Sequence, residues 1–368
     1  MNRDQFYKAA LVISLISMVV TLVMIVMGNI SSGGPFLITF LVALSIAFRG
    51  IPLLKGLAFT IFILGVSATA LYYPGLFIRV NDFELALLIT PLIQLIMFGT
   101  GSSMGLKDFI ELSKSPKSVI VGVLAQFIIM PLLGFLLARA TDFSPEISAG
   151  IILLGCAPTS VTASLFAYLA KANVALAITV TSLTTLLAPL LIPLLMKLFA
   201  GGFIEIDVLG MMWGMIKIVL LPIAAGLLFN KMLSGRAKWL DAGMPYVSMF
   251  GVALIVAIIM AAGRDSILNI GFMLLMVVLL HNVLGYFFGY WAARLCRLNE
   301  RDSRTIAIAT GMQNAGLVSG IAKVMGKIAT VGLASAICGP IMGLTASVLA
   351  SYWSGLESKQ AAKNASDV

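Results

Sequence analysis

Hydrophobic segments of about 20 residues recur along this chain from one end to the other. A helix of that length crosses the hydrocarbon core of a bilayer. Charged residues make up only 11% of the sequence and hydrophobic residues 60%, whereas soluble domains average about 25% charged residues. We therefore predict an all-α, polytopic membrane protein whose surroundings are the lipid bilayer.

Twelve hydrophobic segments can be delimited in the sequence. They are 9–28, 35–48, 51–73, 85–102, 118–138, 147–170, 173–196, 209–230, 244–262, 267–293, 305–325 and 329–353. No small-residue cleavage site follows the first segment, which is therefore predicted to be a retained span rather than a signal peptide. The second segment is short and is expected to be tilted or incomplete.

The distribution of Lys and Arg predicts the orientation of these segments. With the N-terminus inside and the segments alternating, 17 of these residues lie in inside loops and 6 in outside loops. Lys217, which lies within a segment, completes the 24. Because cytoplasmic loops are enriched in Lys and Arg, both termini are predicted to be cytoplasmic. The net charge of +9 is interpreted as this topology signal, and no nucleic-acid partner is expected.

The last ten segments divide into two sets of five, which predicts an internal repeat. Residues 51–196 would form the first five-helix repeat and residues 197–353 the second. An odd number of spans in each set gives the two sets opposite orientations, so the repeats would be inverted. Residues 1–50 form two extra N-terminal segments, and residues 354–368 form a polar cytoplasmic tail that is expected to be disordered.

The fourth segment of each set is interrupted by a polar, helix-breaking patch. The two patches are Gly155–Ser164 and Thr310–Gly316. Irregular backbone at membrane depth is tolerated only where protein buries it or where it lines a cavity. Paired interruptions in two halves of a chain are typical of a transporter's binding site, although small residues also mark close helix packing.

The polar side chains at and near the interruptions are all neutral. They are Thr159, Ser160, Thr162 and Ser164 at the first, Thr310, Gln313 and Asn314 at the second, and Gln126 and Thr181 in neighbouring segments. Hydroxyls, amides and freed carbonyls can bind a cation, whereas half-helix N-termini favour a carboxylate.

None of the fifteen carboxylates lies inside a predicted segment, which argues against a proton relay or an intramembrane aspartyl protease. The sequence contains no nucleotide-binding loop, no metal-ligand cluster and no Ser/His/Asp arrangement. We therefore expect neither an enzyme nor an organic cofactor.

Several short motifs lie between residues 57 and 355. They include Met97–Phe109, Gly122–Pro131, Gly155–Pro158, Tyr168–Lys171, Leu280–Asn282 and Gly311–Asn314. Through these motifs the chain resembles the bile acid:sodium symporter family. The resemblance implies a ten-helix core with a panel and a core domain, two crossing broken helices, and transport of organic anions such as bile acids, pantoate or keto acids, usually with sodium.

The resemblance also implies roles for individual residues. Cation binding would use the side chains of Gln126, Thr181 and Gln313 and the carbonyls of Thr310 and Met312. Substrate binding would use Thr159, Ser160, Ser164 and Asn314.

The chain departs from the family pattern at several of these positions. Ala309 stands where the family has a sodium-binding glutamate, Ala163–Ser164 replaces Ser–Asn, and Thr159–Ser160 replaces a Gly–Gly pair. A carboxylate ~4 Å from a cation contributes on the order of 4 kcal/mol at an effective dielectric constant of ~20. The chain is therefore expected to be a divergent prokaryotic member with weakened sodium binding.

Taken together, these patterns predict a secondary-active transporter of a small organic anion that works by alternating access, with sodium coupling weakened or lost. The expected location is the bacterial inner (plasma) membrane. Two alternatives stay open: a symporter coupled to a single sodium ion, and a non-transporting membrane sensor or receptor derived from a carrier.

Overall fold

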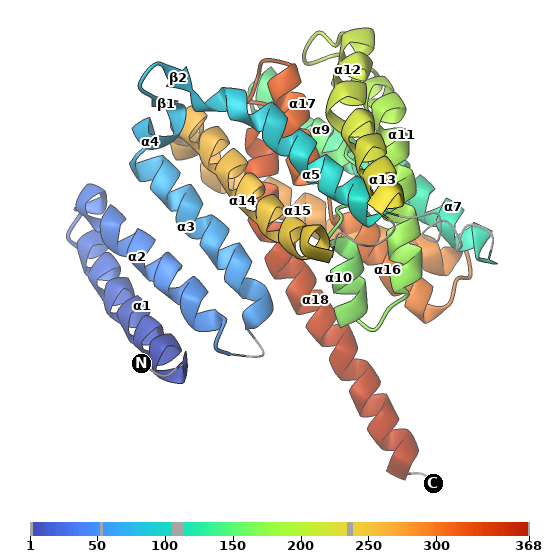
Figure 1. The fold of residues 1–368 in the computed structure, drawn as a ribbon, viewed down its shortest axis with the longest axis horizontal. Helices are drawn as coiled ribbons and strands as arrows, with labels where there is room; N and C mark the ends of the chain where they lie inside the picture. The colour runs from blue at the N-terminus through green and yellow to red at the C-terminus, as the bar shows by residue number, and fades with distance from the viewer. Residues whose placement is uncertain (1–2, 52–53, 105–113, 234–237, 367–368) are drawn as a thin grey trace.

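The computed structural model describes residues 3–51, 54–104, 114–233 and 238–366 as an almost entirely helical bundle (Figure 1). The Gly105–Phe109 part of the first motif lies outside these ranges. The N-terminal elements are α1 (Arg3–Val26), α2 (Ile30–Phe48), the short helix η1 (Lys55–Leu57), α3 (Ala58–Tyr72), α4 (Gly75–Ile78), η2 (Leu85–Leu88) and α5 (Ile89–Ser103). Between α4 and η2, strands β1 (Arg79–Val80) and β2 (Phe83–Glu84) pair antiparallel, with Arg79 opposite Glu84.

The middle and C-terminal elements complete the bundle. They are α7 (Pro116–Leu124), η4 (Ala125–Ile129), α8 (Met130–Arg139), α9 (Pro145–Cys156), α10 (Ala163–Leu169), α11 (Val174–Ala200), α12 (Val208–Met215), η5 (Ile216–Leu220), α13 (Leu221–Leu233), α14 (Lys238–Ala262), α15 (Arg264–Leu295), α16 (Glu300–Gly311), α17 (Ala315–Val324) and α18 (Leu333–Ser366). The segments η4 and η5 are π-helical turns inside otherwise continuous helices.

The hydrophobic segments predicted from the sequence are all found as helices. Ten of them form helical stretches long and apolar enough to cross a membrane. The other two, at 147–170 and 305–325, are each divided into two shorter helices, α9 with α10 and α16 with α17. The prediction of an all-α polytopic membrane protein is therefore confirmed. The second segment is longer than expected, since α2 extends over 19 residues.

The long helices associate in two groups. In the first, which we call the panel, α5 packs against α13 and α14, and α14 packs against α3. In the second, which we call the core, the broken helices pack among α7, α8, α11, α15 and α18. Helices α1 and α2 pack on each other, and α2 packs on α3, so the extra N-terminal segments lie at the edge of the panel (Figure 1).

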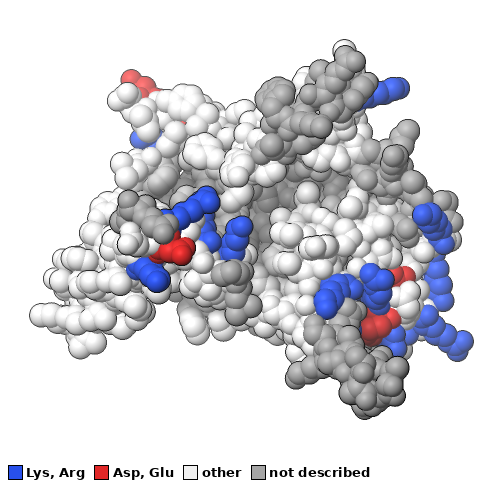
Figure 2. Space-filling model, turned by 60° about the horizontal axis from the view of Figure 1, so that its bottom comes forward, with Lys and Arg blue, Asp and Glu red and all other residues white. Residues whose placement is uncertain are grey.

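Lys and Arg side chains gather on the face of the bundle from which the C-terminus projects (Figure 2). Lys171, Arg297 and Arg301, which are predicted to be cytoplasmic, belong to turns and helix ends of the core. We call this the predicted cytoplasmic end, and we call the end that carries Glu146 and Lys327 the predicted outer end.

The C-terminal tail differs from its prediction. Instead of being disordered, it continues α18 as far as Ser366 and extends away from the bundle (Figure 1). Its Glu, Lys, Gln and Ala residues are good helix formers. Because the tail extends an existing helix, it also avoids the cost of nucleation.

Candidate functional site

The two interruptions meet each other in the middle of the core. Thr159 and Gln313 form an isolated antiparallel β-bridge. On either side of it, the Ser160 N–H donates to the Met312 carbonyl at 2.8 Å and the Asn314 N–H donates to the Pro158 carbonyl at 2.9 Å. Backbone groups that each broken helix leaves unpaired are thus satisfied by the other, which explains how the irregular backbone is tolerated at this depth.

Four helix ends meet at this crossing. Helices α9 and α16 end at Cys156 and Gly311, and α10 and α17 begin at Ala163 and Ala315. Asn314 caps α17, because its Oδ1 accepts the Leu317 N–H at 3.0 Å. The crossing therefore brings together helix C-termini, which carry partial negative charge, and the capped N-terminus of α17, which carries partial positive charge.

The side chains of Gln126 and Gln313 join the crossing to the π-helical turn η4. Gln126 Nε2 donates to the Ala157 carbonyl at 2.6 Å and to Gln313 Oε1 at 2.8 Å. Gln313 Nε2 donates to the Thr310 carbonyl at 2.6 Å. The Thr159 hydroxyl donates to Gln126 Oε1 at 3.4 Å. Residues predicted separately for substrate and cation binding thus form one buried amide network.

Among the residues that the structure describes, four buried side-chain polar atoms have no hydrogen-bond partner. They are Thr181 Oγ1, His281 Nδ1, Thr310 Oγ1 and Asn314 Nδ2. Asn314 is 8% exposed and Thr310 is fully buried. Since an unsatisfied buried polar group costs about 1–3 kcal/mol, these atoms mark where a bound ligand would be stabilising.

The side chains of Ser160 and Ser164 form hydrogen bonds outside the amide network. The Ser160 hydroxyl lies 2.9 Å from Thr162 Oγ1, and Ser164 Oγ donates to the Val161 carbonyl at 3.1 Å. Both hydroxyls therefore make local bonds at the start of α10. Substrate contact by these residues stays a prediction.

The surroundings of Ala309 are apolar. Ala309 is fully buried and belongs to a cluster that contains Ala125, Val180 and Ile306. The Thr310 and Met312 carbonyls, which the resemblance assigns to a cation, already accept hydrogen bonds from Gln313 Nε2 and the Ser160 N–H. In the part of the chain that the structure describes, no three His, Cys, Asp or Glu side chains are grouped as metal ligands.

Helix α15 supports the crossing through residues to which the sequence analysis gave no role. Asn282 Nδ2 donates to the Gly311 carbonyl at 2.8 Å, and Thr345 Oγ1 donates to Asn282 Oδ1 at 2.6 Å. The available signal was an Asn in the middle of a long apolar segment, within the motif Leu280–Asn282. Its partner is 29 residues away, so only the folded chain identifies it.

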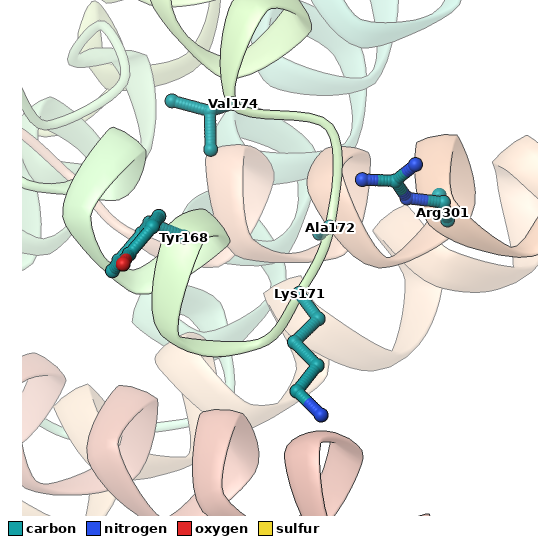
Figure 3. A pocket seen from close by; sticks show the side chains of 5 residues that line it. All are labelled: Tyr168, Lys171, Ala172, Val174 and Arg301. Atoms are coloured by element: carbon teal, nitrogen blue, oxygen red, sulfur yellow. The ribbon is translucent and has the colours of Figure 1, made fainter. Parts of the chain in front are cut away.

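A cavity of about 480 Å³ lies at the predicted cytoplasmic end of the core. It is lined by Tyr168, Lys171, Ala172, Val174 and Arg301. Figure 3 shows that the charged ends of Lys171 and Arg301 point in different directions. The two cations therefore do not converge on one anion, and the amide network at the crossing is the better candidate site.

A close helix contact beside the crossing leads to a first prediction. A methyl group at Gly155 would collide with the Met130 carbonyl and crowd His281. Overpacking of this kind typically costs about 1–3 kcal/mol. We expect Gly155→Ala to lower the thermal unfolding temperature in detergent, whereas Gly339→Ala, whose methyl meets no atom within 4 Å, leaves it unchanged. Equal unfolding temperatures for the two variants would contradict the tight approach of α9 to α8.

Comparison with known proteins assigns the chain to a family. A family model described as the sodium bile acid symporter family matches residues 90–270. An uncharacterized sodium-dependent transporter, YocS, of Bacillus subtilis (strain 168) is 34% identical over 322 residues, which cover 87% of this chain and 98% of that protein.

Plant relatives are similar over much of the same region. A probable chloroplastic sodium/metabolite cotransporter, BASS1, of Oryza sativa subsp. japonica is 30% identical over 82% of this chain and 73% of its own length. A further one, BASS3, of Arabidopsis thaliana is 31% identical over 79% of this chain and 68% of its own length. With the crossing of two broken helices, these matches show that the chain belongs to the sodium bile acid symporter family.

Proposed function

We propose that this protein is a secondary-active carrier of a small organic anion, working by alternating access at the crossing, with sodium coupling weakened or lost. The anion would belong to the bile-acid-like, pantoate or keto acid class. It would contact Asn314 and the polar residues Thr159, Ser160 and Ser164.

The observation that carries this proposal is the balance of donors and acceptors at the crossing. Asn314 Nδ2 is a buried donor without a partner, placed at the N-terminus of α17. A carboxylate supplies the acceptors that such a donor lacks, and the partial positive charge of a helix N-terminus favours it. The carbonyls of Thr310 and Met312, by contrast, are already hydrogen-bonded.

The packing of the half-helices supports alternating access. Helix α17 packs against α5 and α14 of the panel as well as against α18 and α9 of the core, whereas α10 and α16 pack against core helices. Val161, just before α10, and Leu165 and Tyr168 within it are 43%, 54% and 69% exposed. These exposed side chains lie on the half of the first broken helix that faces the predicted cytoplasmic end, and transport would require the core to shift against the panel.

The apolar surroundings of Ala309 support weakened sodium coupling. Ala309 packs with Ala125, Val180 and Ile306, and the candidate cation ligands predicted at the crossing are neutral oxygens. A carboxylate missing at ~4 Å is worth on the order of 4 kcal/mol at a dielectric constant of ~20, or roughly a thousandfold in affinity.

A symporter coupled to a single sodium ion is the second candidate. The relatives described above are named as sodium-dependent or sodium/metabolite transporters. Thr181 Oγ1 and Thr310 Oγ1 are buried and without partners, and hydroxyl oxygens are acceptable ligands for a hard cation.

Uptake by proteoliposomes tests both candidates. With sodium replaced by potassium, we expect the initial rate of saturable anion uptake to fall by less than about threefold, because less than 1 kcal/mol of coupling remains. A strong, saturable sodium requirement would overturn the proposal in favour of single-sodium symport.

The choice of anion and the alternative of a membrane sensor need a separate measurement. Keto acids, pantoate and bile acids would be screened by their effect on thermal unfolding, since a ligand that binds the folded state raises its stability. Binding of an anion without flux into vesicles would indicate a sensor or receptor rather than a carrier.

A further inference from the structure

Each broken helix is tied to the other near both ends of the core, as well as at the crossing. Near the predicted cytoplasmic end, Asp302 accepts hydrogen bonds from Asn173 Nδ2 on Oδ1 and from Ser118 Oγ on Oδ2, both at 2.8 Å. We call these three residues the inner clasp. They join α16 to the starts of α7 and α11, and Asp302 is only 6% exposed.

The inner clasp is reinforced by the helix ends on which it is built. Asn173 also caps α11, because its Oδ1 accepts the Leu176 N–H at 3.1 Å. Its backbone N–H donates to Thr305 Oγ1 at 2.8 Å, one turn beyond Asp302. The Asp302 N–H donates to Asn299 Oδ1 at 2.8 Å. A carboxylate in the first turn of a helix is favoured by the helix dipole, so burial of Asp302 is compensated by dipoles and hydrogen bonds.

The predicted outer end contains a similar arrangement built from the opposite parts of the chain. Glu146, in the first turn of α9, accepts hydrogen bonds from Lys327 Nζ and, at 2.7 Å, from Thr330 Oγ1. We call these three residues the outer clasp. In each clasp, a carboxylate in the first turn of one broken helix binds the turn that follows the other broken helix.

The turns that carry the donors are also alike. The turn after α10 contains Lys171 with a φ of 53°, and the turn after α17 contains Gly326 with a φ of 69°. A left-handed residue is a common way to end a helix. Asn173 and Lys327 follow these residues closely, which places both donors opposite a helix N-terminus.

The inner clasp controls the position of the crossing through α16. Every residue of α16 from Asp302 to Gly311 is buried. Thr310 lies eight positions after Asp302, which is about 12 Å along the helix at 1.5 Å per residue. Because a packed helix is rigid along its axis, a displacement at Asp302 would be transmitted to Thr310 and Gln313.

We propose that Asp302 is a positioning residue that, through Asn173 and Ser118, keeps the two broken helices moving as one unit during transport. This rests on the proposed carrier function. Since Asp302 lies away from the crossing, its contribution is to the rate of translocation and not to contact with the anion.

Exchanging the two partners gives a sharp test. Asn173→Asp places the carboxylate of a half-buried residue 2.8 Å from that of the buried Asp302, and like charges so placed repel strongly. The double variant Asn173→Asp with Asp302→Asn restores one amide and one carboxylate. Asp at 173 can still cap α11, and Asn at 302 can still accept from Ser118.

We expect Asn173→Asp to lower the maximal uptake rate per folded carrier at least about tenfold, with a KM within about twofold of the wild type. The double variant should recover the rate to within about threefold. Asn81→Asp, which adds a carboxylate in the exposed turn between β1 and β2, is the matched control and should leave the rate unchanged. If Asn173 and Asp302 had only a structural role, Asn173→Asp would lower the yield of folded protein, but the protein that folds would keep the wild-type maximal rate.

A second measurement keeps this inference separate from the carrier function. Hydrogen–deuterium exchange of residues 300–314 in detergent should increase in Asn173→Asp and return to the wild-type level in the double variant. If the exchange changes in this way but the wild-type protein transports no anion, the result would support the clasp and overturn the carrier function. Wild-type turnover and exchange in Asn173→Asp, or a folded double variant that stays slow, would overturn the clasp.

Discussion

Replacing Ala309 by glutamate is expected to tighten sodium binding at the crossing by up to roughly a thousandfold. A carboxylate ~4 Å from a cation stabilises the bound cation by on the order of 4 kcal/mol at an effective dielectric constant of ~20. Ala309 is fully buried and immediately precedes Thr310. Half-saturation of uptake by sodium would therefore move to a much lower concentration.

The same substitution should make the stability of the protein depend on sodium. Without the cation, a carboxylate would be buried among Ala125, Val180 and Ile306, which is costly for an unpaired charge. Thermal unfolding of Ala309→Glu should thus occur at a clearly higher temperature in sodium than in potassium, through mass action on the folded state.

Ala309→Gln separates charge from volume in this experiment. Glutamine has nearly the same size as glutamate but carries no charge, so it should disturb the packing without creating a sodium response. If the two variants respond equally to sodium, or if neither responds, the position does not account for weakened coupling.

Replacing Gln313 by alanine is expected to reduce anion uptake by about 10–100-fold. The Gln313 side chain is 1% exposed. It is the donor to the Thr310 carbonyl and the acceptor from Gln126 Nε2. Its removal leaves buried polar groups unsatisfied at about 1–3 kcal/mol each, at the position where the two broken helices pair.

Gln94→Ala provides the comparison for this effect. Gln94 Nε2 also donates to a backbone carbonyl, that of Lys217 at 3.2 Å, but it is half-buried and lies in the panel. Uptake by Gln94→Ala should stay within about twofold of the wild type, since this hydrogen bond takes no part in the pairing of the two broken helices. Wild-type uptake by Gln313→Ala would show that the amide network does not form the transport site.

The sequence predicted the membrane segments well because hydrophobic length is a property of local sequence. Bilayer thickness sets the length of a span, and Gly, Pro and polar residues mark where a span is broken. The position of both interruptions could therefore be inferred before the fold was known. The π-helical turns η4 and η5 could not be predicted, because no local residue pattern specifies where a helix widens by one residue.

The candidate site was only partly predictable. The amide-bearing residues Gln126 and Gln313 were selected through family motifs, and they do meet, although 187 residues separate them. Ser164 was selected in the same way, but its hydroxyl bonds to its own turn. Which of two neighbouring hydroxyls points into the network depends on side-chain direction within the folded core.

The sequence by itself determined that the chain is a bundle of membrane helices with two helices interrupted at mid-span. Water is absent at that depth, so an unpaired backbone group has few ways to be satisfied. Only the tertiary structure decided how they are satisfied: each interruption pairs with the other across the Thr159–Gln313 bridge. It also decided that clasps at both ends of the core hold that pairing. The clasp contacts join residues 129 and 184 positions apart, and such long-range pairings depend on the packing of the whole bundle rather than on local sequence.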